Sequence, residues 1–323
     1  MANKSKKLSL LVVADPLDRF DPKAETTLYI MREASRRGHR VYHTEPKLLS
    51  SRKTTVRAWC KKVEIRSGRN PWYRCGREEY RDLIRFDAVL LRKDPPFDLP
   101  YLHHLFLLEL ISDQVYFMNH PSGILVGNEK IFPLPFDAWV PDTLISAQKD
   151  ELLDFIKHHR HGVILKPLGE AGGRGIFKIN SLKAENLMAL LDHATAGFTR
   201  FTLAQAYLPE AKSGDKRIML LGPKILGAFR RRPAPGEHRA NLHMGGTAAP
   251  AKVSRKDQEM IDQLRPSLLR MGLDFVGLDV IGDKLIEVNV TSPMGLHELN
   301  ATQGGASERD VVDYLEMQTR RLQ

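Results

Sequence analysis

The sequence is poor in cysteine and has no long hydrophobic run. Its 323 residues include two cysteines, Cys60 and Cys75, too few for a disulfide framework or a zinc site with four cysteine ligands. The longest apolar stretch, residues 105–111, is far shorter than the roughly 20 residues that a membrane-spanning helix needs, and it contains Glu109. These absences exclude a disulfide-stapled scaffold and a membrane-spanning protein, and they favour a protein of the reducing cytoplasm.

The N-terminus begins with basic residues and an apolar run at residues 8–14, a combination that resembles a secretory signal. Asp15 and Pro16 end the run, and no cleavage site of small residues follows. We therefore interpret the run as the first buried strand of an α/β sheet. No internal repeat or low-complexity tract is present in the rest of the chain.

Basic residues exceed acidic ones, and most of the excess falls in one segment. The chain has 49 Lys and Arg against 39 Asp and Glu, and residues 52–81 contain ten basic and three acidic residues. A positive balance suits anionic partners such as nucleotides, polyanionic metabolites or nucleic acid. Trp59, Trp72, Tyr73 and Tyr80 interleave with these charges, as in grooves that stack single-stranded bases. The favoured alternative is a solvated or subunit-facing surface.

Apolar periodicity and turn residues predict an α/β protein whose first part is a parallel sheet that ends near residue 122. After that point the chain changes character, and two strands flank a glycine-rich loop, which predicts a hairpin. A loop rich in proline and glycine is expected at residues 233–250. The expected strands lie at residues 8–13, 41–44, 88–91, 115–118, 163–167, 175–179, 202–206, 218–221, 225–229, 275–281 and 285–290, and the expected helices at 26–37, 102–111, 149–158 and 256–271.

The glycine-rich loop, LGEAGGRG at residues 168–175, fits neither of two common phosphate-binding patterns. It lacks the Gly-Lys-Ser/Thr of a Walker loop and the Gly-x-Gly-x-x-Gly of a dinucleotide fingerprint, and no helix follows it. A glycine hairpin can still turn backbone N–H groups towards phosphate oxygens, because glycine has no Cβ. Taken alone, the loop could equally be a flexible surface turn.

Two lysines and three oxygen-bearing side chains surround this loop in the expected structure. Lys166 precedes the loop on its strand, and Lys130 lies on the preceding element, so both could neutralise one polyphosphate. Glu287 and Asn289 are two apart on a strand and share a face, with Ile286 expected on the other face. A short turn at residues 282–284 would place Asp279 opposite Glu287. Carboxylates this close favour a magnesium site.

Arginines form the remaining cluster of candidates. They are Arg217, the run at residues 230–232, and Arg239, which is followed by Asn241. Guanidinium groups bind carboxylates and phosphates bidentately, and a mobile loop at residues 233–250 could close over a substrate. Lysines, a glycine hairpin, metal ligands and loop arginines together are what ATP-driven joining of a carboxylate to an amine needs.

These motifs resemble those of the prokaryotic-type glutathione synthetases of the ATP-grasp superfamily, in order and spacing, over nearly the whole chain. The matching blocks are RKDPPFD at residues 92–98, NEK at 128–130, VILKPL with the glycine loop at 163–175, AQAYLP at 204–209, GDKRI at 214–218, RANL at 239–242, and VGLDVIGDKLIEVNVTSP at 276–293. The resemblance implies an ATP-grasp fold with an N-terminal Rossmann-like (pre-ATP-grasp) substrate domain at residues 1–122, a lid subdomain at 123–206 and a C-terminal catalytic subdomain at 207–323.

The resemblance also implies a reaction and a set of site residues. The implied reaction joins γ-glutamylcysteine to glycine through an acyl phosphate, with ATP and Mg²⁺, or Mn²⁺ in its place, in a cytoplasmic homo-oligomer. It assigns ATP contacts to Lys130, Lys166, Gly172, Gly173, Gln205, Tyr207, Leu208 and Asp215; the metal to Asp279, Glu287 and Asn289; catalysis to Arg217, Arg231 and Arg239; and substrate contacts to Asn241, Ser292, Met294 and His297.

The sequence departs from the family pattern beside the expected substrate pocket. Where the family has Thr-x-x-Arg-Glu after Thr-Ser-Pro, this chain has residues 294–298, with Met294 first and His297 in place of the arginine. An arginine that commonly precedes the Asn-Glu-Lys block is replaced by apolar residues at 125–127, and the tail at 300–307 is unusual. A ligase of the same family with another amine or peptide substrate is therefore the alternative, and a nucleic-acid-binding protein is the alternative of another class.

Overall fold

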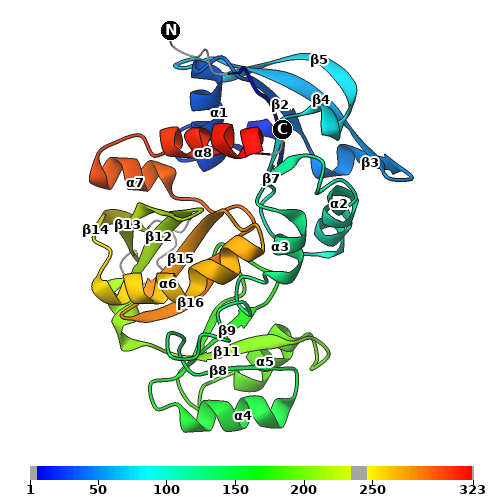
Figure 1. Cartoon of the computed structure of the whole chain (residues 1–323). Helices are drawn as coiled ribbons and strands as arrows, with labels where there is room; N and C mark the ends of the chain where they lie inside the picture. The colour runs from blue at the N-terminus through cyan, green and yellow to red at the C-terminus, as the bar shows by residue number, and fades with distance from the viewer. Residues whose placement is uncertain (1–5, 234–245, 322–323) are drawn as a thin grey trace.

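The computed structural model describes residues 6–233 and 246–321, which form three β-sheets in chain order (Figure 1). The strands are β1 Ser9–Ala14, β2 Arg40–Thr44, β3 Leu49–Arg52, β4 Thr55–Ile65, β5 Tyr73–Asp82, β6 Ala88–Arg92, β7 Tyr116–Met118, β8 Thr143–Ser146, β9 Val163–Pro167, β10 Phe177–Ile179, β11 Thr202–Ala206, β12 Asp215–Leu221, β13 Lys224–Arg232, β14 Thr247–Ala251, β15 Phe275–Ile281 and β16 Lys284–Asn289. The α-helices are α1 Thr26–Arg36, α2 Leu99–Glu109, α3 Pro121–Val126, α4 Lys149–His158, α5 Leu187–Thr195, α6 Arg255–Arg270, α7 Leu296–Gln303 and α8 Glu308–Arg321. None of the described helices is long and apolar enough to cross a membrane.

The first sheet has the strand order β3-β4-β2-β1-β6-β7, with β5 paired to β4. β2, β1, β6 and β7 are parallel, as the alternation of strands and helices predicts. β1 is buried along its whole length, which explains its continuous apolar run. The short apolar run at the N-terminus is therefore the central strand of a sheet.

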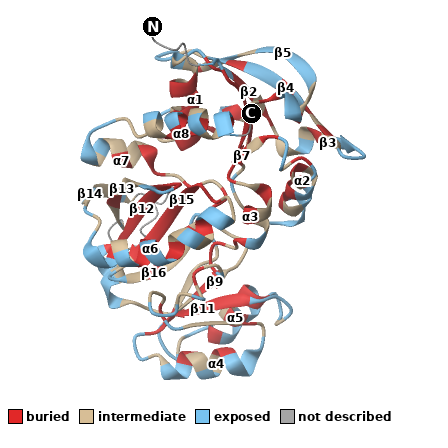
Figure 2. Ribbon diagram, viewed as in Figure 1, coloured by how far each residue is buried: buried red, intermediate tan, exposed pale blue. Residues whose placement is uncertain are grey.

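The basic segment at residues 52–81 forms most of the hairpin β4–β5, which Figure 2 shows as largely exposed on its outer side. The expected strands did not include it. Trp72, one of its four interleaved aromatic residues, is buried and stacks on Phe20, so it is unavailable to bases. Trp59 and Tyr80 are about half exposed and contact each other. Nucleic-acid binding and a subunit interface at this hairpin both stay predictions.

The second and third sheets are antiparallel and carry helices on one face each. In the second, with the order β10-β9-β11-β8, Leu165 and Ala204 pack with α4 and α5. In the third, with the order β14-β13-β12-β15-β16, Leu278 and Val288 pack with α6. The opposite faces of the two sheets are free of these helices, and the candidate site described below lies there.

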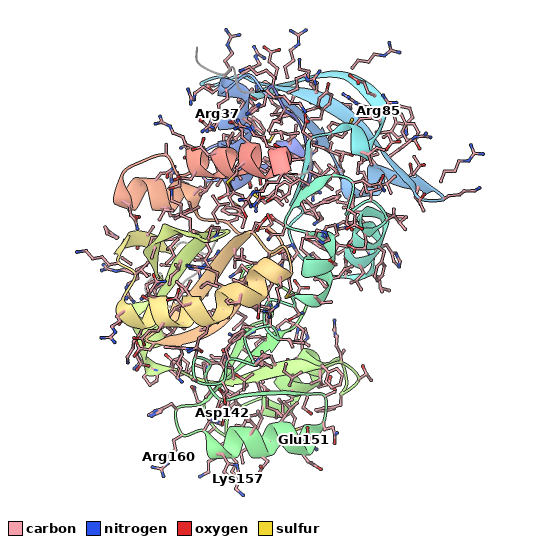
Figure 3. The ribbon with its side chains drawn as sticks, viewed as in Figure 1. Arg37, Arg85, Asp142, Glu151, Lys157 and Arg160 are labelled. Atoms are coloured by element: carbon pink, nitrogen blue, oxygen red, sulfur yellow. The ribbon has the colours of Figure 1, made fainter. Side chains whose placement is uncertain are left out.

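The last helix of the described chain, α8, returns to the first sheet and packs against α1 (Figure 1). Arg37, labelled in Figure 3, lies at the end of α1 and pairs with Asp313 and Glu316 of α8. Glu33 accepts hydrogen bonds from the guanidinium groups of Arg36 and Arg37 at 2.7 Å each. The division of the chain into three domains, with boundaries at residues 122 and 206, stays a prediction. α8, which belongs to the third of these domains, packs against α1 of the first.

Several expected elements match the structure, and others depart from the expectation. The bounds of α4, β11 and β15 are those expected. β14 begins inside the expected loop at 233–250 and ends at Ala251, because backbone pairing with β13 creates this strand whatever its composition; residues 234–245 lie outside the described part. The helices α3, α5, α7 and α8 were not among those expected.

We expect Glu33→Gln to lower the free energy of unfolding by about 1.5–3 kcal/mol at pH 7, because Glu33 is buried and accepts charged hydrogen bonds. Hydrogen bonds from Arg36 and Arg37, opposed by burial, lower the pKa of Glu33 from 4.5 to about 2. The stabilisation should therefore be complete above pH 4.5 and decline as the pH falls towards 2. Urea unfolding of the parent and the variant at several pH values measures it.

The exposed Glu185 has no ion pair among the described residues, so Glu185→Gln is the matched control and should leave stability unchanged. A difference between parent and Glu33→Gln that stays constant from pH 7 to pH 2.5 would contradict this assignment of the pKa.

Candidate functional site

Two adjoining cavities contain all the site residues expected from the sequence that the structure describes. The inter-sheet cavity lies between the second and third sheets, and the adjoining cavity extends from it towards the first sheet. Both are lined by Gly172, Arg217, Arg231 and Asn289, so they meet at these residues. The other expected residues divide between them: Lys130, Lys166, Gly173, Gln205, Tyr207, Leu208, Asp215, Asp279 and Glu287 line the inter-sheet cavity, and Ser292, Met294 and His297 the adjoining one.

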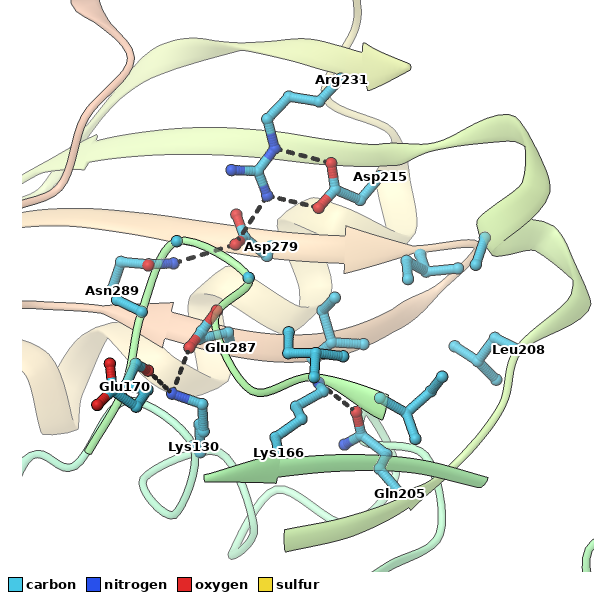
Figure 4. Close-up of a pocket in the computed structure, with 18 of the residues that line it drawn as sticks. Lys130, Lys166, Glu170, Gln205, Leu208, Asp215, Arg231, Asp279, Glu287 and Asn289 are labelled. Atoms are coloured by element: carbon cyan, nitrogen blue, oxygen red, sulfur yellow. Dashed lines mark hydrogen bonds and ion pairs between the residues drawn. The ribbon is translucent and has the colours of Figure 1, made fainter. Parts of the chain in front are cut away.

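Lys166 is a buried cation without an acidic hydrogen-bond partner among the described residues. It lies on β9 opposite Leu203 of β11, and its Nζ donates to Oε1 of Gln205 at 2.8 Å (Figure 4). Burial, partly offset by Glu287, lowers the pKa of Lys166 to about 8. A buried ammonium held by one amide oxygen favours an anionic ligand, because such a ligand would restore the charge partner that burial removes.

Lys130 ties the glycine loop to the third sheet. Its Nζ donates to the carbonyl oxygen of Glu170 at 2.6 Å and lies 3.1 Å from Oε1 of Glu287 (Figure 4). Asn128 donates to the carbonyl oxygen of Leu168 and accepts from the backbone N–H of Lys130. The Asn-Glu-Lys turn thus binds the backbone of the glycine loop at two positions, Leu168 and Glu170.

The glycine loop needs glycine at three positions. Gly172, Gly173 and Gly175 have φ values of 70°, 79° and 66°, a conformation that other L-residues rarely adopt. A Cβ at Gly175 would also come within 2.9 Å of Cγ of Pro167. The expected hairpin between β9 and β10 is present, and the loop between these strands lines the inter-sheet cavity.

Two arginines and two aspartates form a buried ion cluster on β12, β13 and β15. Arg217 pairs with both carboxylate oxygens of Asp279, at 2.5 and 3.0 Å. Nε of Arg231 lies 2.8 Å from Oδ1 of Asp215, and its Nη2 lies 2.8 Å from Oδ2 of Asp279 (Figure 4). Burial alone would raise the pKa of Asp279, but the two guanidinium groups lower it to about 2. The resemblance implies an ATP contact for Asp215, which stays a prediction; in the structure this side chain pairs with Arg231.

The third sheet places the expected metal ligands together. Asp279 lies directly opposite Glu287 in the β15–β16 register, as expected. The expected turn at 282–284 was wrong, because Ile281 pairs with Lys284, and a register shift next to Asp279 brings the two carboxylates opposite each other. Asn289 donates from Nδ2 to Oδ2 of Asp279 at 3.3 Å and to the carbonyl oxygen of Gly277, which leaves its Oδ1 available. The expectation that Ile286 faces away was wrong: the register shifts between Asp279 and Val280, so Ile286 is an extra residue and lines the cavity beside Glu287.

The donor set fits a hard divalent cation. Two carboxylates and one amide oxygen are ligands of the type that Mg²⁺ uses together with substrate phosphates. Within the described residues no three His, Cys, Asp or Glu side chains are grouped as a metal site, so these residues supply only part of a coordination shell. Such a set suits an ion that a bound polyphosphate completes.

The adjoining cavity contains the positions where the sequence departs from the family pattern. Nδ1 of His297 lies 2.8 Å from the hydroxyl of Tyr29 on α1, so the first sheet contributes to this wall. The carbonyl oxygen of Met294 accepts from Nη1 of Arg217 at 3.0 Å, and Met294 Sδ lies 3.6 Å from Nη2 of Arg92. Arg239 and Asn241, expected in this region, lie outside the described residues.

Two buried charged residues shape the site without having been singled out in the sequence. Oε1 of Glu129 accepts from the backbone N–H groups of Val290 and Thr291 at 2.9 and 3.0 Å, which holds the end of β16. Arg92 is 3% exposed and donates to Oγ1 of Thr27 and the carbonyl oxygen of Pro293. Both lie in motif blocks, which is the only signal that could have identified them.

Comparison with known proteins agrees with this geometry. The family model "Prokaryotic glutathione synthetase, N-terminal domain" matches residues 8–124, and "Prokaryotic glutathione synthetase, ATP-grasp domain" matches residues 129–304. A glutathione synthetase of Nitrosomonas europaea is 38% identical over 97% of this chain and 99% of its own, and one of Brucella melitensis is 36% identical over 92% and 95%. The chain belongs to the prokaryotic glutathione synthetase family.

Solved structures show that the fold of this family member is the expected ATP-grasp fold. The crystal structure of D-cycloserine synthetase DcsG has a TM-score of 0.66 at 14% identity and covers 98% of this chain and 100% of its own. The ATP-grasp ligase PsnB, complexed with its precursor peptide PsnA2 and AMPPNP, has a TM-score of 0.60 at 19% identity, with 97% and 99% covered. The expected family and fold class are confirmed.

We expect nucleotide affinity in this glutathione synthetase family member to fall as the pH rises through about 8, because Lys166 then loses its proton. Lys166→Ala should weaken nucleotide binding roughly 10- to 150-fold at pH 7, the equivalent of a charged hydrogen bond of about 1.5–3 kcal/mol. Lys166→Arg should bind with little dependence on pH up to 9.5, since guanidinium stays charged. Calorimetry with a non-hydrolysable ATP analogue measures all three.

Lys183→Ala is the control, because Lys183 is exposed and lines neither cavity. A nucleotide affinity of the parent protein that stays constant between pH 7 and 9.5 would show that phosphate binding does not depend on the charge of Lys166.

Proposed function

We propose that this ATP-dependent ligase is a glutathione synthetase, which joins the cysteinyl carboxylate of γ-glutamylcysteine to the amine of glycine. The family supports the activity, since relatives named glutathione synthetase share 34–38% identity over nearly the full chain. The observation that carries the proposal is the meeting of two cavities at Arg217, Arg231 and Asn289. A nucleotide in one cavity and a carboxylate in the other would come together at these three residues.

The nucleotide would lie in the inter-sheet cavity with its phosphates near Lys130, Lys166 and the glycine loop. Gln205, Tyr207 and Leu208 line the same cavity and offer the amide and ring surfaces that suit a base. The ring of Tyr207 is already covered by Lys178, whose Nζ lies 3.6 Å from the ring centroid. This arrangement supports an adenine position against β11 and the residues that follow it.

A carboxylate is a poor electrophile, and its phosphorylation by ATP gives an acyl phosphate with a good leaving group. Arg231 lines both cavities and would stabilise the negative charge that develops when the phosphoryl group passes between them. Arg217 binds Asp279 through Nε and Nη2, and the carbonyl oxygen of Met294 through Nη1. It therefore orients β15, which carries Asp279, together with the wall of the adjoining cavity. Excluding water from this boundary would protect the acyl phosphate from hydrolysis.

Mg²⁺ is the metal that we propose for Asp279, Glu287 and Asn289, where it would neutralise phosphate charge. Asp279 remains ionised at neutral pH because its pKa is about 2, and Glu287 shares the cavity with Lys130. Mn²⁺ prefers similar oxygen ligands and would serve in its place.

The acceptor is the least constrained part of the proposal. His297 and Met294 replace the family pattern on the wall of the adjoining cavity, so an amine other than glycine, or another γ-glutamyl peptide, is the second candidate. We also propose that the enzyme acts on small molecules in the cytoplasm; a homo-oligomeric state stays a prediction.

Phosphate release in the presence of ATP, Mg²⁺, γ-glutamylcysteine and a panel of amino acids tests the function. We expect the highest kcat/KM with glycine, and mass spectrometry should identify the tripeptide. Arg231→Gln should lower kcat by at least about 100-fold, because it removes a preorganised donor from the reacting charge. Arg230→Ala should stay near the parent, since Arg230 neighbours Arg231 in sequence but lines neither cavity.

A clear preference for another amine would replace glycine in the proposal and keep the ligase. Phosphate release that does not depend on any amine, or equal losses in Arg230→Ala and Arg231→Gln, would overturn the assigned chemistry.

Glu287→Gln should keep the fold and lower turnover at least about tenfold, because a neutral amide is a weaker metal ligand than a carboxylate. Its activity should recover in part at higher Mg²⁺ concentration, while the melting temperature stays near that of the parent. Asp283→Asn is the matched control, since Asp283 lies on the turn of the same hairpin and pairs with Lys256 on the surface. A normal Mg²⁺ titration in Glu287→Gln would contradict the metal assignment.

A further inference from the structure

A third cavity, which the proposed reaction does not use, lies at the carboxyl ends of β1, β2 and β6. We call it the switch-point cavity, because the chain leaves β1 towards β2 on one side while β6 pairs on the other. Ligands of open α/β sheets bind preferentially at this place. The cavity has a volume of about 470 Å³ and shares no lining residue with the inter-sheet or adjoining cavity. Its size is within the usual range for small-molecule sites.

His104 of α2 is an unpartnered hydrogen-bond acceptor in the wall of the switch-point cavity. Its side chain lines this cavity and is 5% exposed, and its Nδ1 lies 3.2 Å from the carbonyl oxygen of Pro100, which can only accept. The ring proton is therefore on Nδ1, and Nε2 has no partner among the described residues. Burial lowers the pKa of His104 to about 4, so the ring is neutral at pH 7 and Nε2 keeps its lone pair.

The charged groups of the same cavity balance each other. Its carboxylates are those of Asp15, Glu45 and Asp98, and its cations are Arg19, Lys47 and Lys93. Lys93 pairs with Asp15 at 3.2 Å, and Lys47 with Glu45 at 2.8 Å.

Two of these charged groups have hydrogen-bonding atoms without a partner among the described residues, and these atoms could bind a ligand. Arg19 has no side-chain partner among the described residues. Asp98 uses Oδ1 to accept from the backbone N–H of Tyr101 at the start of α2, which leaves Oδ2. A free guanidinium suits a carboxylate, while a free carboxylate oxygen and a neutral imidazole nitrogen suit an ammonium group.

We propose that the switch-point cavity is a second binding site, for a small zwitterion that carries a carboxylate and a protonated amine, as an α-amino acid or a short peptide does. The carboxylate binds Arg19, and the ammonium donates to Nε2 of His104 and to Asp98. The balanced charges of the lining disfavour a polyphosphate or a nucleic acid, which would leave the carboxylates of the cavity opposed to an anion.

Occupation of this site would act, through residues 93–98, on the inter-sheet cavity, where we propose that the nucleotide binds. Lys93, Pro96 and Asp98 line the switch-point cavity, whereas Pro95 and Phe97 contact the glycine loop. The carbonyl oxygen of Pro95 accepts from Arg174 at 3.1 Å, and the backbone N–H of Phe97 donates to the carbonyl oxygen of Gly169 at 2.8 Å. The zwitterion would therefore change the affinity for ATP, and ATP would change the affinity for the zwitterion by the same factor.

Histidine side-chain NMR separates this site from the substrate site, because His104 lies in the switch-point cavity and His297 in the adjoining one. The probes are L-alanine and L-glutamine, with acetate and methylammonium as single-charge controls. We expect both amino acids to shift the His104 resonance saturably, and each single-charge control to bind at least tenfold more weakly. His104→Gln assigns the resonance.

Arg19→Ala is the decisive variant, since Arg19 is exposed and its removal should leave the fold unchanged. It should weaken the His104 response at least tenfold and leave any response of His297 as in the parent. Arg85→Ala should behave as the parent, because Arg85, labelled in Figure 3, lines none of the three cavities.

A His104 resonance that no amino acid moves, an unchanged response in Arg19→Ala, or equal binding of acetate would overturn the proposed site. The KM for ATP, measured with and without saturating L-glutamine, tests the coupling: it should shift in the parent and stay constant in Arg19→Ala. A KM that is the same under both conditions in the parent would overturn the coupling, whereas a ligase that fails to make glutathione leaves the NMR result standing.

Discussion

The buried ion cluster of Arg217, Arg231, Asp215 and Asp279 is the interaction on which the site depends. Burying a single carboxylate in a protein costs several kcal/mol unless a cation and hydrogen bonds compensate. Here three neighbouring strands supply the compensation, because β12 lies between β13 and β15 and presents Asp215 to one and Arg217 to the other. The cluster keeps Asp279 ionised and aligned with Glu287 across β15 and β16.

The Asn-Glu-Lys turn couples this sheet to the glycine loop. Its three side chains bind different parts of the molecule: Asn128 the backbone at Leu168, Glu129 the end of β16, and Lys130 both Glu170 and Glu287. Through these contacts the turn sets the distance between the two walls of the inter-sheet cavity. Residues 93–98, which follow β6 of the first sheet, contact the same loop through Pro95 and Phe97.

The sequence predicted most of the site because local rules govern much of it. Strand alternation put Glu287 and Asn289 on one face. The pairing of Asp279 with Glu287 depends on the bulge between them and the turn, because the turn pairs Ile281 with Lys284. The same alternation failed for Ile286, since a bulge inserts one residue and reverses its direction. The hairpin β4–β5 was missed because its exposed charges hide the alternation of Val56, Ala58 and Cys60, which pack into the core.

Sequence alone determined the family, the ATP-grasp fold and the residues that gather in two cavities, because motif blocks and apolar periodicity are written along the chain. Only the tertiary structure decided which charges neutralise each other: Asp215 pairs with Arg231, and α8 returns to α1 through Arg37. It also decided that His104, a residue of an apolar helix, leaves one nitrogen without a partner among the described residues in the wall of a cavity. Such pairings join residues distant in the chain, and their energies depend on burial and distance, which no local pattern encodes.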